Sequence, residues 1–370
     1  MNIIIIAILS VLFSMLAIVF LLLKSRNMHL WMLSYIKECF NKVASTNKKK
    51  HIYFCLVDHY EPYYKKVTQA TARNLVKDWL ANYREIACKH QDSDGQHPKH
   101  SYFYPIEEYD ETILDDLKDI CQQGYGDVDI HLHHDNDNEH NLRKTLLDFK
   151  ELLYTRHSLL RKDDQGNIVY GFIHGNWALD NSRPDGRWCG VDNEIDVLLQ
   201  TGCVFDMTMP SAPSDTQTST INQIYFARED GKCKSHDTGI AAKVGNWMSD
   251  RLLMIQGPLT LNWKRRKFGL IPRIESSELS YDAPPAADRL ILWEQCGICL
   301  KGAENHIFIK LHTHGLQPQN SKMFFENNGL DNLWSMLESR YTSNDNYSLH
   351  YVSAWEMYQQ IKNLSCHHSE

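Results

Sequence analysis

The sequence predicts an α/β protein: an incomplete barrel of seven to eight strand–helix units, preceded by one apolar helix. Short apolar runs alternate with longer stretches of helical periodicity between residues 51 and 364. Such alternation implies parallel strands joined by right-handed crossovers, and six to eight units favour a closed or nearly closed barrel. The 370 residues, 43% of them hydrophobic, can fill the core of one large domain.

The units follow one another along the chain. Strands are predicted at residues 51–57, 101–105, 128–133, 168–174, 204–207, 251–256, 306–312 and 349–352. Helices are predicted at residues 70–88, 111–122, 141–160, 192–200 and 354–364. Residues 208–248, rich in Ser, Thr, Pro and Gly, interrupt the alternation and are predicted to form a long loop near the functional site.

The N-terminal segment is distinct from this domain. Residues 3–23 carry no charge and only Ser10 and Ser14 are polar, a length and composition that suit a membrane-spanning helix. Basic residues, beginning with Lys24 and Arg26, lie only on its C-terminal side, which favours a cytoplasmic location for the large domain. The sequence thus predicts a single-pass inner-membrane protein; a periplasmic domain is the alternative orientation.

Three segments are therefore expected. Residues 1–26 would form the transmembrane anchor, residues 27–50 an amphipathic and basic linker, and residues 51–366 a catalytic (β/α) barrel domain. The linker helix is expected either at the membrane surface or packed on the domain. The net charge of −7 argues against nucleic acid as a partner, because phosphate binding requires a basic surface.

The third predicted strand ends in the strongest chemical signal of the chain. His131, His133, His134 and Asp135 offer four possible ligands within five residues. Residues at alternate positions of a strand share a face, so His131 and His133 point together. Imidazole and carboxylate sets suit borderline divalent metals, and a solvated polar turn is the alternative.

The first strand ends with Asp58 and His59, which pair a possible carboxylate base with a possible metal ligand. The alternative is an aspartate that caps the following turn. The seventh strand ends with His312 and His314. A histidine at the rim suits general acid catalysis, because its unperturbed pKa lies near neutral pH; a core histidine bonded to the backbone is the alternative.

The fourth strand ends at His174 and leads into a loop rich in residues typical of binding sites. Aromatic side chains beside amide and charged groups would suit a sugar, and two core tryptophans with a structural ion pair are the alternative. Asp206, at the end of the next strand, would orient a catalytic histidine or cap a turn. The predicted substrate-binding residues are His174, Asn176, Trp177, Asp180, Arg183 and Trp188.

These segments resemble the motifs of the NodB-like polysaccharide deacetylases (carbohydrate esterase family 4). The resemblance places Asp58 at the position of the family's catalytic base and His59 at a ligand position. The spacing of the second motif gives His131 and Asp135, with ligand types exchanged relative to the family. The family's final Leu-x-His motif falls on His312 or His314. The resemblance implies an incomplete (β/α) barrel and a divalent metal held by two histidines and one carboxylate.

The chain from residue 51 to about 364 is also similar to a family of bacterial membrane-anchored proteins that carry an HGNWALDNS stretch, here residues 174–182. That family is associated with surface-polysaccharide synthesis. The similarity implies a glycan or lipid-linked sugar as substrate, and other polysaccharide-synthesis proteins as partners.

The expected function is therefore a metal-dependent deacetylase-like hydrolase. Zn or another first-row transition metal would be held by His59, His131 and Asp135, with His133 or His134 as substitutes. Asp58 would act as the base and His312 or His314 as the acid, with Asp206 in support. Two alternatives remain: a metal-dependent glycoside or phosphoester hydrolase on the same barrel, and a non-catalytic glycan-binding scaffold.

Overall fold

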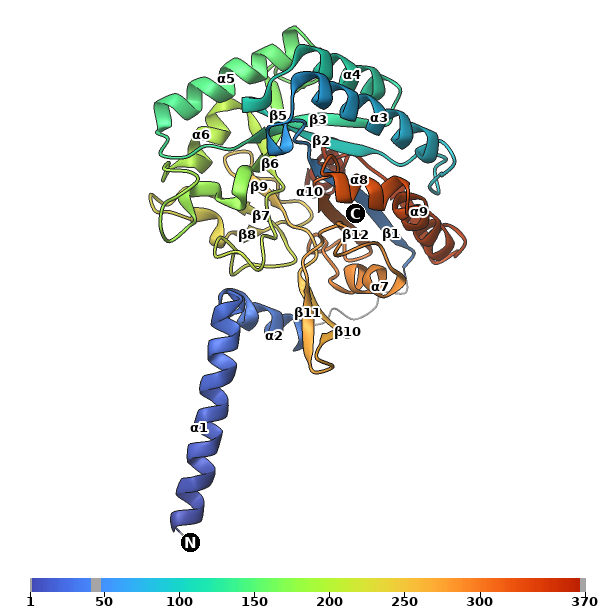
Figure 1. Ribbon diagram of the computed structural model, residues 1–370. Helices are drawn as coiled ribbons and strands as arrows, with labels where there is room; N and C mark the ends of the chain where they lie inside the picture. The colour runs from blue at the N-terminus through green and yellow to red at the C-terminus, as the bar shows by residue number, and fades with distance from the viewer. Residues whose placement is uncertain (1, 41–47, 367–370) are drawn as a thin grey trace.

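The computed structural model describes residues 2–40 and 48–366. It shows a mixed α/β fold around a curved, mostly parallel sheet (Figure 1). The parallel strands lie in the order β12-β1-β2-β3-β5-β6-β9, and β13 also pairs with β1. They are β1 (Lys50–His59), β2 (His100–Pro105), β3 (Gly126–Leu132), β5 (Ile168–His174), β6 (Cys203–Asp206), β9 (Leu252–Ile255), β12 (His306–Thr313) and β13 (Tyr347–Tyr351).

Antiparallel strands extend this sheet at one end. Strand β7 (Ile224–Ala227) pairs antiparallel with β9 and with β8 (Ile240–Ala241), and β4 (Arg161–Lys162) pairs antiparallel with β5. A separate hairpin is formed by β10 (Thr260–Lys267) and β11 (Ile271–Glu275). The predicted alternation of strands and helices is thus confirmed as a mixed α/β fold with a mainly parallel sheet.

Helices connect the strands, and several begin with a side-chain cap. The helices are α1 (Asn2–Ser25), α2 (Met32–Phe40), α3 (Gln69–Ala87), α4 (Glu111–Gln122), α5 (Glu139–Thr155), α6 (Glu194–Thr201), α7 (Ala287–Gln295), α8 (Pro318–Phe325), α9 (Gly329–Leu337) and α10 (Ala354–Cys366). Thr68, Asp110 and Asn138 accept backbone N–H groups at the starts of α3, α4 and α5. These bonds satisfy amides that have no partner inside the helix.

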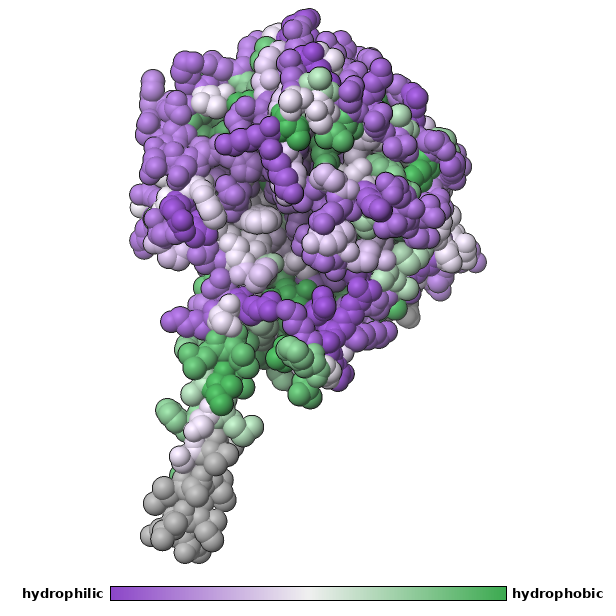
Figure 2. Space-filling view, viewed as in Figure 1, coloured by the Kyte–Doolittle hydropathy of each residue, from purple (hydrophilic) through white to green (hydrophobic). Residues whose placement is uncertain are grey.

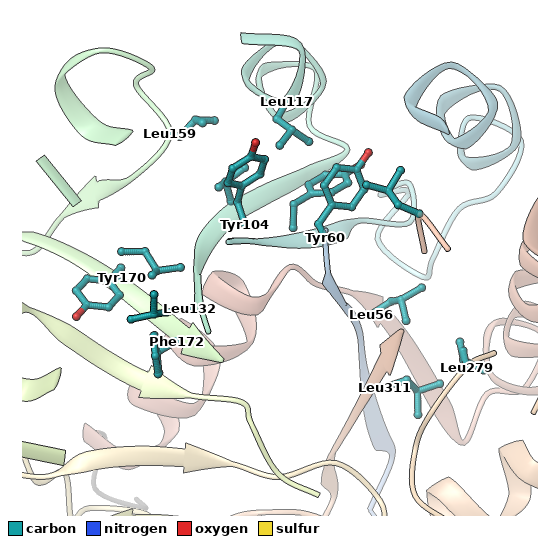
Figure 3. Packing of buried hydrophobic residues seen from close by; sticks show 14 of the residues in the cluster. Leu56, Tyr60, Tyr104, Leu117, Leu132, Leu159, Tyr170, Phe172, Leu279 and Leu311 are labelled. Atoms are coloured by element: carbon teal, nitrogen blue, oxygen red, sulfur yellow. The ribbon is translucent and has the colours of Figure 1, made fainter. Parts of the chain in front are cut away.

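Both faces of the parallel sheet are buried, as parallel sheets require. Alternate residues of β1 separate into two apolar clusters: Phe54 and Leu56 pack under the surrounding helices, whereas Tyr53, Cys55 and Val57 face the other side. Figure 3 shows part of the first cluster. The period of two along a strand explains this division.

Helix α10 covers the amino-terminal ends of two strands. The backbone N–H of Ala354 donates to Ser101 Oγ at the start of β2, and that of Trp355 donates to Asp127 Oδ2 at the start of β3. Met357 and Ile361 then pack into the second apolar cluster. Because this end is covered by apolar side chains, the polar residues gather at the opposite, carboxyl ends of the strands.

The segment between α1 and the domain packs on the domain. Trp31 is buried against Ala212, Ile221, Leu259 and Leu261. Glu38 Oε2, on α2, accepts a hydrogen bond of 2.7 Å from Asn222 Nδ2. Of the two expectations for this segment, the structure matches the linker helix packed on the domain.

Helix α1 projects from the body of the molecule (Figure 1). Figure 2 shows a largely polar surface over the body and apolar side chains near α2 and the β10–β11 hairpin, where Phe40, Phe268 and Leu270 are exposed. A spanning helix needs about 20 consecutive apolar residues. Among the side chains that the structure describes, no helix is long and apolar enough to cross a membrane. This finding contradicts the predicted transmembrane anchor and the single-pass inner-membrane localisation.

The long loop predicted at residues 208–248 contains two short strands, β7 and β8, which pair with the end of the sheet. The remainder is irregular and lies over the carboxyl end of β6. It is held there by side-chain bonds such as those of Gln217 Oε1, which accepts the N–H groups of Ser211 and Ala212. This segment is therefore ordered by polar contacts.

Candidate metal centre

Histidines from three strands meet at the carboxyl ends of the parallel sheet. His59 ends β1, His131 lies near the end of β3, and His314 follows β12. The ring centroid of His59 lies 4.8 Å from that of His131 and 4.6 Å from that of His314. The first, third and seventh predicted strand ends therefore converge. We call His59, Glu61, His131, His133 and His314 the rim cluster.

Glu61 lies at the middle of the rim cluster. Its Oε1 atom is 3.6 Å from His131 Nε2, 3.5 Å from His133 Nε2 and 4.0 Å from His314 Nε2. Two metal-compatible groups of side chains share this carboxylate: one adds His59 and His314, the other His131 and His133. Glu61 was not singled out from the sequence, because it lies two residues beyond the end of β1, where strand periodicity gives no guide to its direction.

The orientation of His131 fits a metal ligand. Its Nδ1 atom lies 2.7 Å from the carbonyl oxygen of Ile173, which can only accept, so Nδ1 carries the proton. The lone pair of Nε2 then points into the rim cluster, where this buried atom has no hydrogen-bond partner. A carbonyl that fixes the tautomer of a ligand histidine in this way is typical of metal sites.

His133 is oriented by a second carboxylate. Its Nδ1 atom lies 2.5 Å from Glu107 Oε1, while Nε2 faces Glu61. Burial alone would lower the pKa of His133, but the hydrogen bond and the charge of Glu107 outweigh it and raise the pKa. Glu107 is another functional candidate that sequence reasoning missed.

Burial and neighbouring side chains shift the pKa values of His59 and Glu61 in the rim cluster. Burial and the neighbouring histidines hold the pKa of His59 well below its usual value, so this ring is neutral and able to bind a cation. Burial would raise the pKa of Glu61, but its contact with His131 and the charge interactions with His314, His131 and His133 lower it. The cluster therefore combines a carboxylate with the neutral imidazole of His59.

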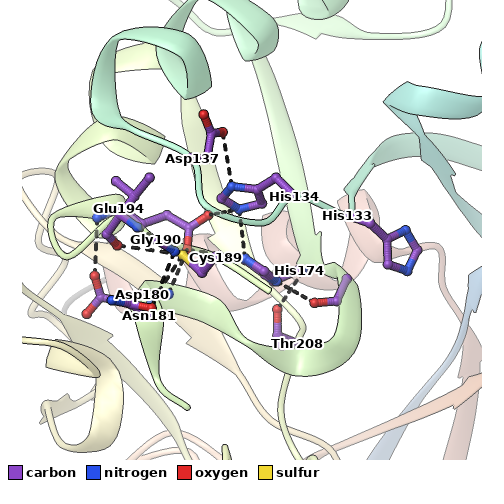
Figure 4. Close-up of polar contacts among 12 residues, drawn as sticks. His133, His134, Asp137, His174, Asp180, Asn181, Cys189, Gly190, Glu194 and Thr208 are labelled. Carbon is purple, nitrogen blue, oxygen red and sulfur yellow. Dashed lines mark hydrogen bonds and ion pairs between the residues drawn. The ribbon is translucent and has the colours of Figure 1, made fainter. Parts of the chain in front are cut away.

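A second group of side chains lies beside the rim (Figure 4). His134 Nε2 is 2.8 Å from His174 Nε2 and 3.2 Å from Glu194 Oε1. Cys189 Sγ is 3.4 Å from Glu194 Oε2. We call His134, His174, Cys189 and Glu194 the inner cluster. Figure 4 shows His133 pointing away from it, so two consecutive histidines serve different clusters.

Asp135 lies in neither cluster. Its Oδ1 atom accepts a hydrogen bond of 2.6 Å from the backbone N–H of Trp188, which fixes the loop after β5. The predicted ligand set is corrected accordingly: Glu61 is the carboxylate that faces His59 and His131, and His134 belongs to the inner cluster. The turn after β3 continues through Asn136, whose φ is positive.

Asp58 is a buried supporting residue in this structure. Its Oδ2 atom lies 2.9 Å from His100 Nε2, and its Oδ1 atom accepts the N–H of Gly315 at 2.8 Å. Residues 58 and 59 point to opposite faces of β1, so Asp58 holds the turn that carries His314. The contacts differ from those expected of a catalytic base.

Asp206 and His312 also lie behind the rim cluster. Asp206 accepts the N–H and the hydroxyl of Thr208, and burial raises the pKa of Asp206 to about 7. Thr208 Oγ1 in turn accepts the backbone N–H of His174. The ring of His312 lies 6.1 Å from that of His59, and burial holds the pKa of His312 well below its usual value. Both residues support the strand ends.

Trp177 is the predicted sugar-binding residue that reaches the rim cluster. Its ring centroid lies 6.1 Å from that of His59 and 6.3 Å from that of His314. Both Asn176 and Trp177 have positive φ, so the chain turns sharply after His174. This turn places an aromatic face beside the histidines.

The other predicted substrate-binding residues shape the loop itself. Asp180 is buried and accepts the N–H groups of Glu194 and Ser235. Arg183 bonds Asp185 and Asp215, and its guanidinium lies 4.3 Å from the ring centroid of Trp188. Arg183 thus forms an ion pair within the loop, while Trp177 and Trp188 are only half-buried, unlike the two core tryptophans of the alternative.

Comparisons with known proteins add little. No protein-family model matches the chain, and no curated protein matches it. Among solved structures, the chain is similar to a 4-alpha-glucanotransferase from Thermococcus litoralis, with 10% sequence identity and a TM-score of 0.43. The match covers 85% of this chain and spans 40% of the length of that protein.

Proposed function

We propose that this protein is a metal-dependent deacetylase-like hydrolase that removes an acetyl group from a glycan or lipid-linked sugar in surface-polysaccharide metabolism. The observation that carries the proposal is the rim cluster, in which one half-buried carboxylate, Glu61, faces the Nε2 atoms of His131, His133 and His314. We further propose that the curved sheet is an incomplete (β/α) barrel, in which sites of this kind occupy the carboxyl ends of the strands.

The residues of the rim cluster divide into ligands and proton carriers. His59, His131 and Glu61 would hold Zn or another first-row transition metal. They come from the two metal-compatible groups that share Glu61, they are the most buried of the five, and they comprise two imidazoles and one carboxylate. When bound, such an ion polarises an acyl oxygen and makes a water molecule more acidic.

The two remaining histidines would move protons. His314, which is partly exposed, would take the proton of the attacking water as a new bond forms to the acyl carbon. His133, oriented by Glu107 and with a raised pKa, would give its proton to the leaving amine or alcohol as the C–N or C–O bond breaks. The products are acetate and the deacetylated sugar.

Trp177 supports a sugar as the substrate class. Its indole lies beside two histidines of the rim cluster at a sharp turn, and aromatic faces cover the apolar side of a pyranose ring. Its indole Nε1 is buried and has no hydrogen-bond partner within the protein, so it is a free donor for a hydroxyl or carbonyl oxygen.

Replacement of Glu61 tests the proposal. Because a neutral amide cannot balance a divalent cation among imidazoles, Glu61→Gln should lower rim metal content and reduce acetate release from N- and O-acetylated oligosaccharides by at least about 100-fold. Glu107→Gln should keep the metal and reduce kcat alone, because it affects the proton carrier. Metal content is measured by elemental analysis and acetate by an enzyme-coupled assay.

Glu85→Gln, at an exposed helix position, is the matched control and should behave as the wild type. Acetate release that is unaffected by Glu61→Gln would refute the mechanism. If metal binds but glycosides or phosphate esters are cleaved instead, the reaction class is wrong. A washed protein that binds no metal at the rim cluster would favour a glycan-binding scaffold.

A further inference from the structure

We propose that the inner cluster, His134, His174, Cys189 and Glu194, is a second, closed metal site that holds a zinc-like ion for structural reasons. It is separate from the proposed rim metal and does not depend on the proposed reaction. Four protein ligands with no place for water are typical of structural zinc, whereas catalytic sites keep one position open.

The separations within the inner cluster suit one tetrahedral ion. Zinc–nitrogen bonds of about 2.0–2.1 Å place neighbouring ligand atoms about 3.3 Å apart at tetrahedral angles. The observed separations are 2.8 Å between the two Nε2 atoms, 3.2 Å from His134 Nε2 to Glu194 Oε1 and 3.5 Å from His174 Nε2 to Glu194 Oε2. All four candidate ligand atoms lie within 4.8 Å of one another.

The orientations of the two imidazoles point to a cation between them. His134 Nδ1 lies 3.1 Å from Asp137 Oδ2, and His174 Nδ1 lies 2.5 Å from the carbonyl oxygen of Gly175. Both partners are acceptors, so both Nδ1 atoms carry protons. In neutral rings the two Nε2 lone pairs would then face each other at 2.8 Å. A bound metal ion uses both lone pairs; a shared proton is the competing explanation.

Two backbone N–H groups are directed at the Cys189 sulfur, although burial and the charge of Glu194 raise the pKa of the thiol to about 12 when no cation is bound. The backbone N–H groups of Asn181 and Val191 donate to Cys189 Sγ at 3.3 and 3.4 Å. Two donors directed at one buried sulfur stabilise negative charge, which a metal ligand requires. Without a cation, that sulfur would lie beside the Glu194 carboxylate, which is fully buried.

The packing around the inner cluster depends on a glycine, Gly190. Gly190 has a φ of 96°, and a Cβ there would lie 2.8 Å from Asp137 N and 2.9 Å from Asp137 O. The N–H of Asp137 also donates to the carbonyl of Cys189 at 3.0 Å. Glycine at this position therefore lets the cysteine loop approach the turn that carries His134 and its supporting carboxylate.

An ion at this place would join four segments: the turn after β3, the end of β5, the loop before Cys189 and the start of α6. The loop between His174 and Glu194 carries Trp177, which lies beside the rim cluster. The inner ion would therefore fix the position of the aromatic face and of the turn that also carries His133.

Cobalt substitution tests the inference, because thiolate ligation gives Co²⁺ an intense charge-transfer band in the near ultraviolet. The two rim groups contain no cysteine, so an ion bound at the rim cluster gives no such band, and the cysteine variants below assign the band to Cys189. The full-length chain, freed of metal with a chelator and titrated with CoCl₂, should develop this band at one equivalent, and ZnCl₂ should abolish it. The band should be lost in Cys189→Ser and retained in Cys88→Ser, an exposed control.

Two further measurements test the inference even if the Cys189→Ser variant misfolds. Asp137→Asn removes the charge that supports His134 and keeps a side-chain oxygen for the N–H of Asn138 and the amide of Asn141, and it should weaken Co²⁺ affinity by about 10–100-fold. X-ray absorption of the zinc-loaded wild type should show a sulfur neighbour at about 2.3 Å. A wild-type chain with neither the band nor the sulfur neighbour contains a shared proton instead, and the inference is then wrong. The band in a chain that releases no acetate would refute the proposed function alone.

Discussion

Gly175, between the two clusters, shows how closely single residues are constrained. A Cβ there would lie 2.5 Å from His133 Cγ and 2.7 Å from the carbonyl oxygen of Leu132. Gly315 is in a similar position, since a Cβ would overlap Asp58 Oδ2. Each glycine follows a histidine at a strand end. Their lack of a side chain lets the chain turn while the histidine stays directed at its cluster.

Gly175→Ala should displace His133 from Glu61. We expect a loss of about 1–3 kcal/mol in the free energy of unfolding, because a methyl group must be accommodated against backbone. Metal affinity at the rim cluster should fall as well. Urea unfolding and metal titration measure the two effects. Gly231→Ala, in open space, is the control and should leave metal affinity unchanged; equal metal affinity in both variants would contradict the expectation.

At this scale the sequence allowed part of the site to be predicted. His59, His131, His133 and His314 could be placed because strand ends and their alternation are visible as apolar periodicity. The positions of side chains in turns could not be predicted from this periodicity. Asp135 and Glu61 are both carboxylates near a strand end, and they differ in long-range contacts: Asp135 accepts the N–H of Trp188, whereas Glu61 faces histidines at or just after the ends of β3 and β12.

Helix α4 illustrates how a charge supports a whole element. Asp110 accepts the N–H groups of Thr112 and Ile113 at its start and also bonds Arg73 on α3 and the Tyr63 hydroxyl. Burial would raise the pKa of Asp110, but the bonds from Arg73, Tyr63 and Gln69 outweigh it and lower the pKa to about 2. The carboxylate thus links α3 to α4.

Asp110→Asn should remove the charge and keep the helix cap, since asparagine caps a helix as well as aspartate does. A folded pKa near 2 and an unfolded pKa near 3.9 mean that the ionic contribution is full above about pH 4. It is lost as the pH falls through about 2. The deficit in stability of the variant should therefore be present at pH 7 and shrink towards pH 2, as measured by thermal unfolding.

Asp148→Asn, on the exposed face of α5, is the matched control and should differ little from the wild type at any pH. A deficit for Asp110→Asn that stays constant between pH 7 and pH 2 would exclude the ionic explanation and leave packing as the cause.

Element boundaries were partly predictable. The helix predicted at residues 141–160 is α5 (Glu139–Thr155), which begins where Asn138 caps it and ends well before residue 160. The periodicity continues through Leu159 and Leu160 because both are buried in the same apolar cluster although they are not helical. The burial of these two non-helical residues therefore gave the sequence an apolar spacing that resembles that of a helix.

Across the whole molecule, Lys310 connects distant parts of the sheet. Its Nζ atom, on β12, donates to the carbonyl oxygens of Met207 and Met209 beyond β6, at 2.9 and 2.7 Å. Burial lowers the pKa of Lys310 to about 7. The side chain crosses between strands that are not neighbours in the sheet order, and it therefore stabilises the curvature that brings the strand ends together.

Lys310→Met should remove the Lys310 donor from the carbonyl of Met207 and one of two donors from that of Met209, which also accepts the N–H of Gly257; a buried carbonyl left unpaired costs about 1–3 kcal/mol. We expect a clear drop in the urea midpoint, together with weaker metal binding at the rim cluster. Lys301→Met, on the surface just before β12, should stay within about 0.5 kcal/mol of the wild type. Similar midpoints for the two variants would show that the cross-sheet bonds contribute little.

The alternation of strands and helices was predictable because each element carries its own periodicity. The division of the histidines between two clusters was not, since His134 and His174 meet through the pairing of β3 with β5 and through a cysteine loop distant in sequence. The cis peptide bonds before Pro210 and Pro213, in the loop that Lys310 contacts, were also not predictable from the sequence pattern.

The adjacency of His133 and His134 has a consequence for divergence within the lineage of this protein. Residues on this turn can be exchanged one at a time, each change affecting one cluster. An insertion or deletion of a single residue would rotate both histidines at once and abolish both clusters together. Relatives that retain both clusters should therefore keep His133, His134 and the number of residues between Leu132 and Asp137.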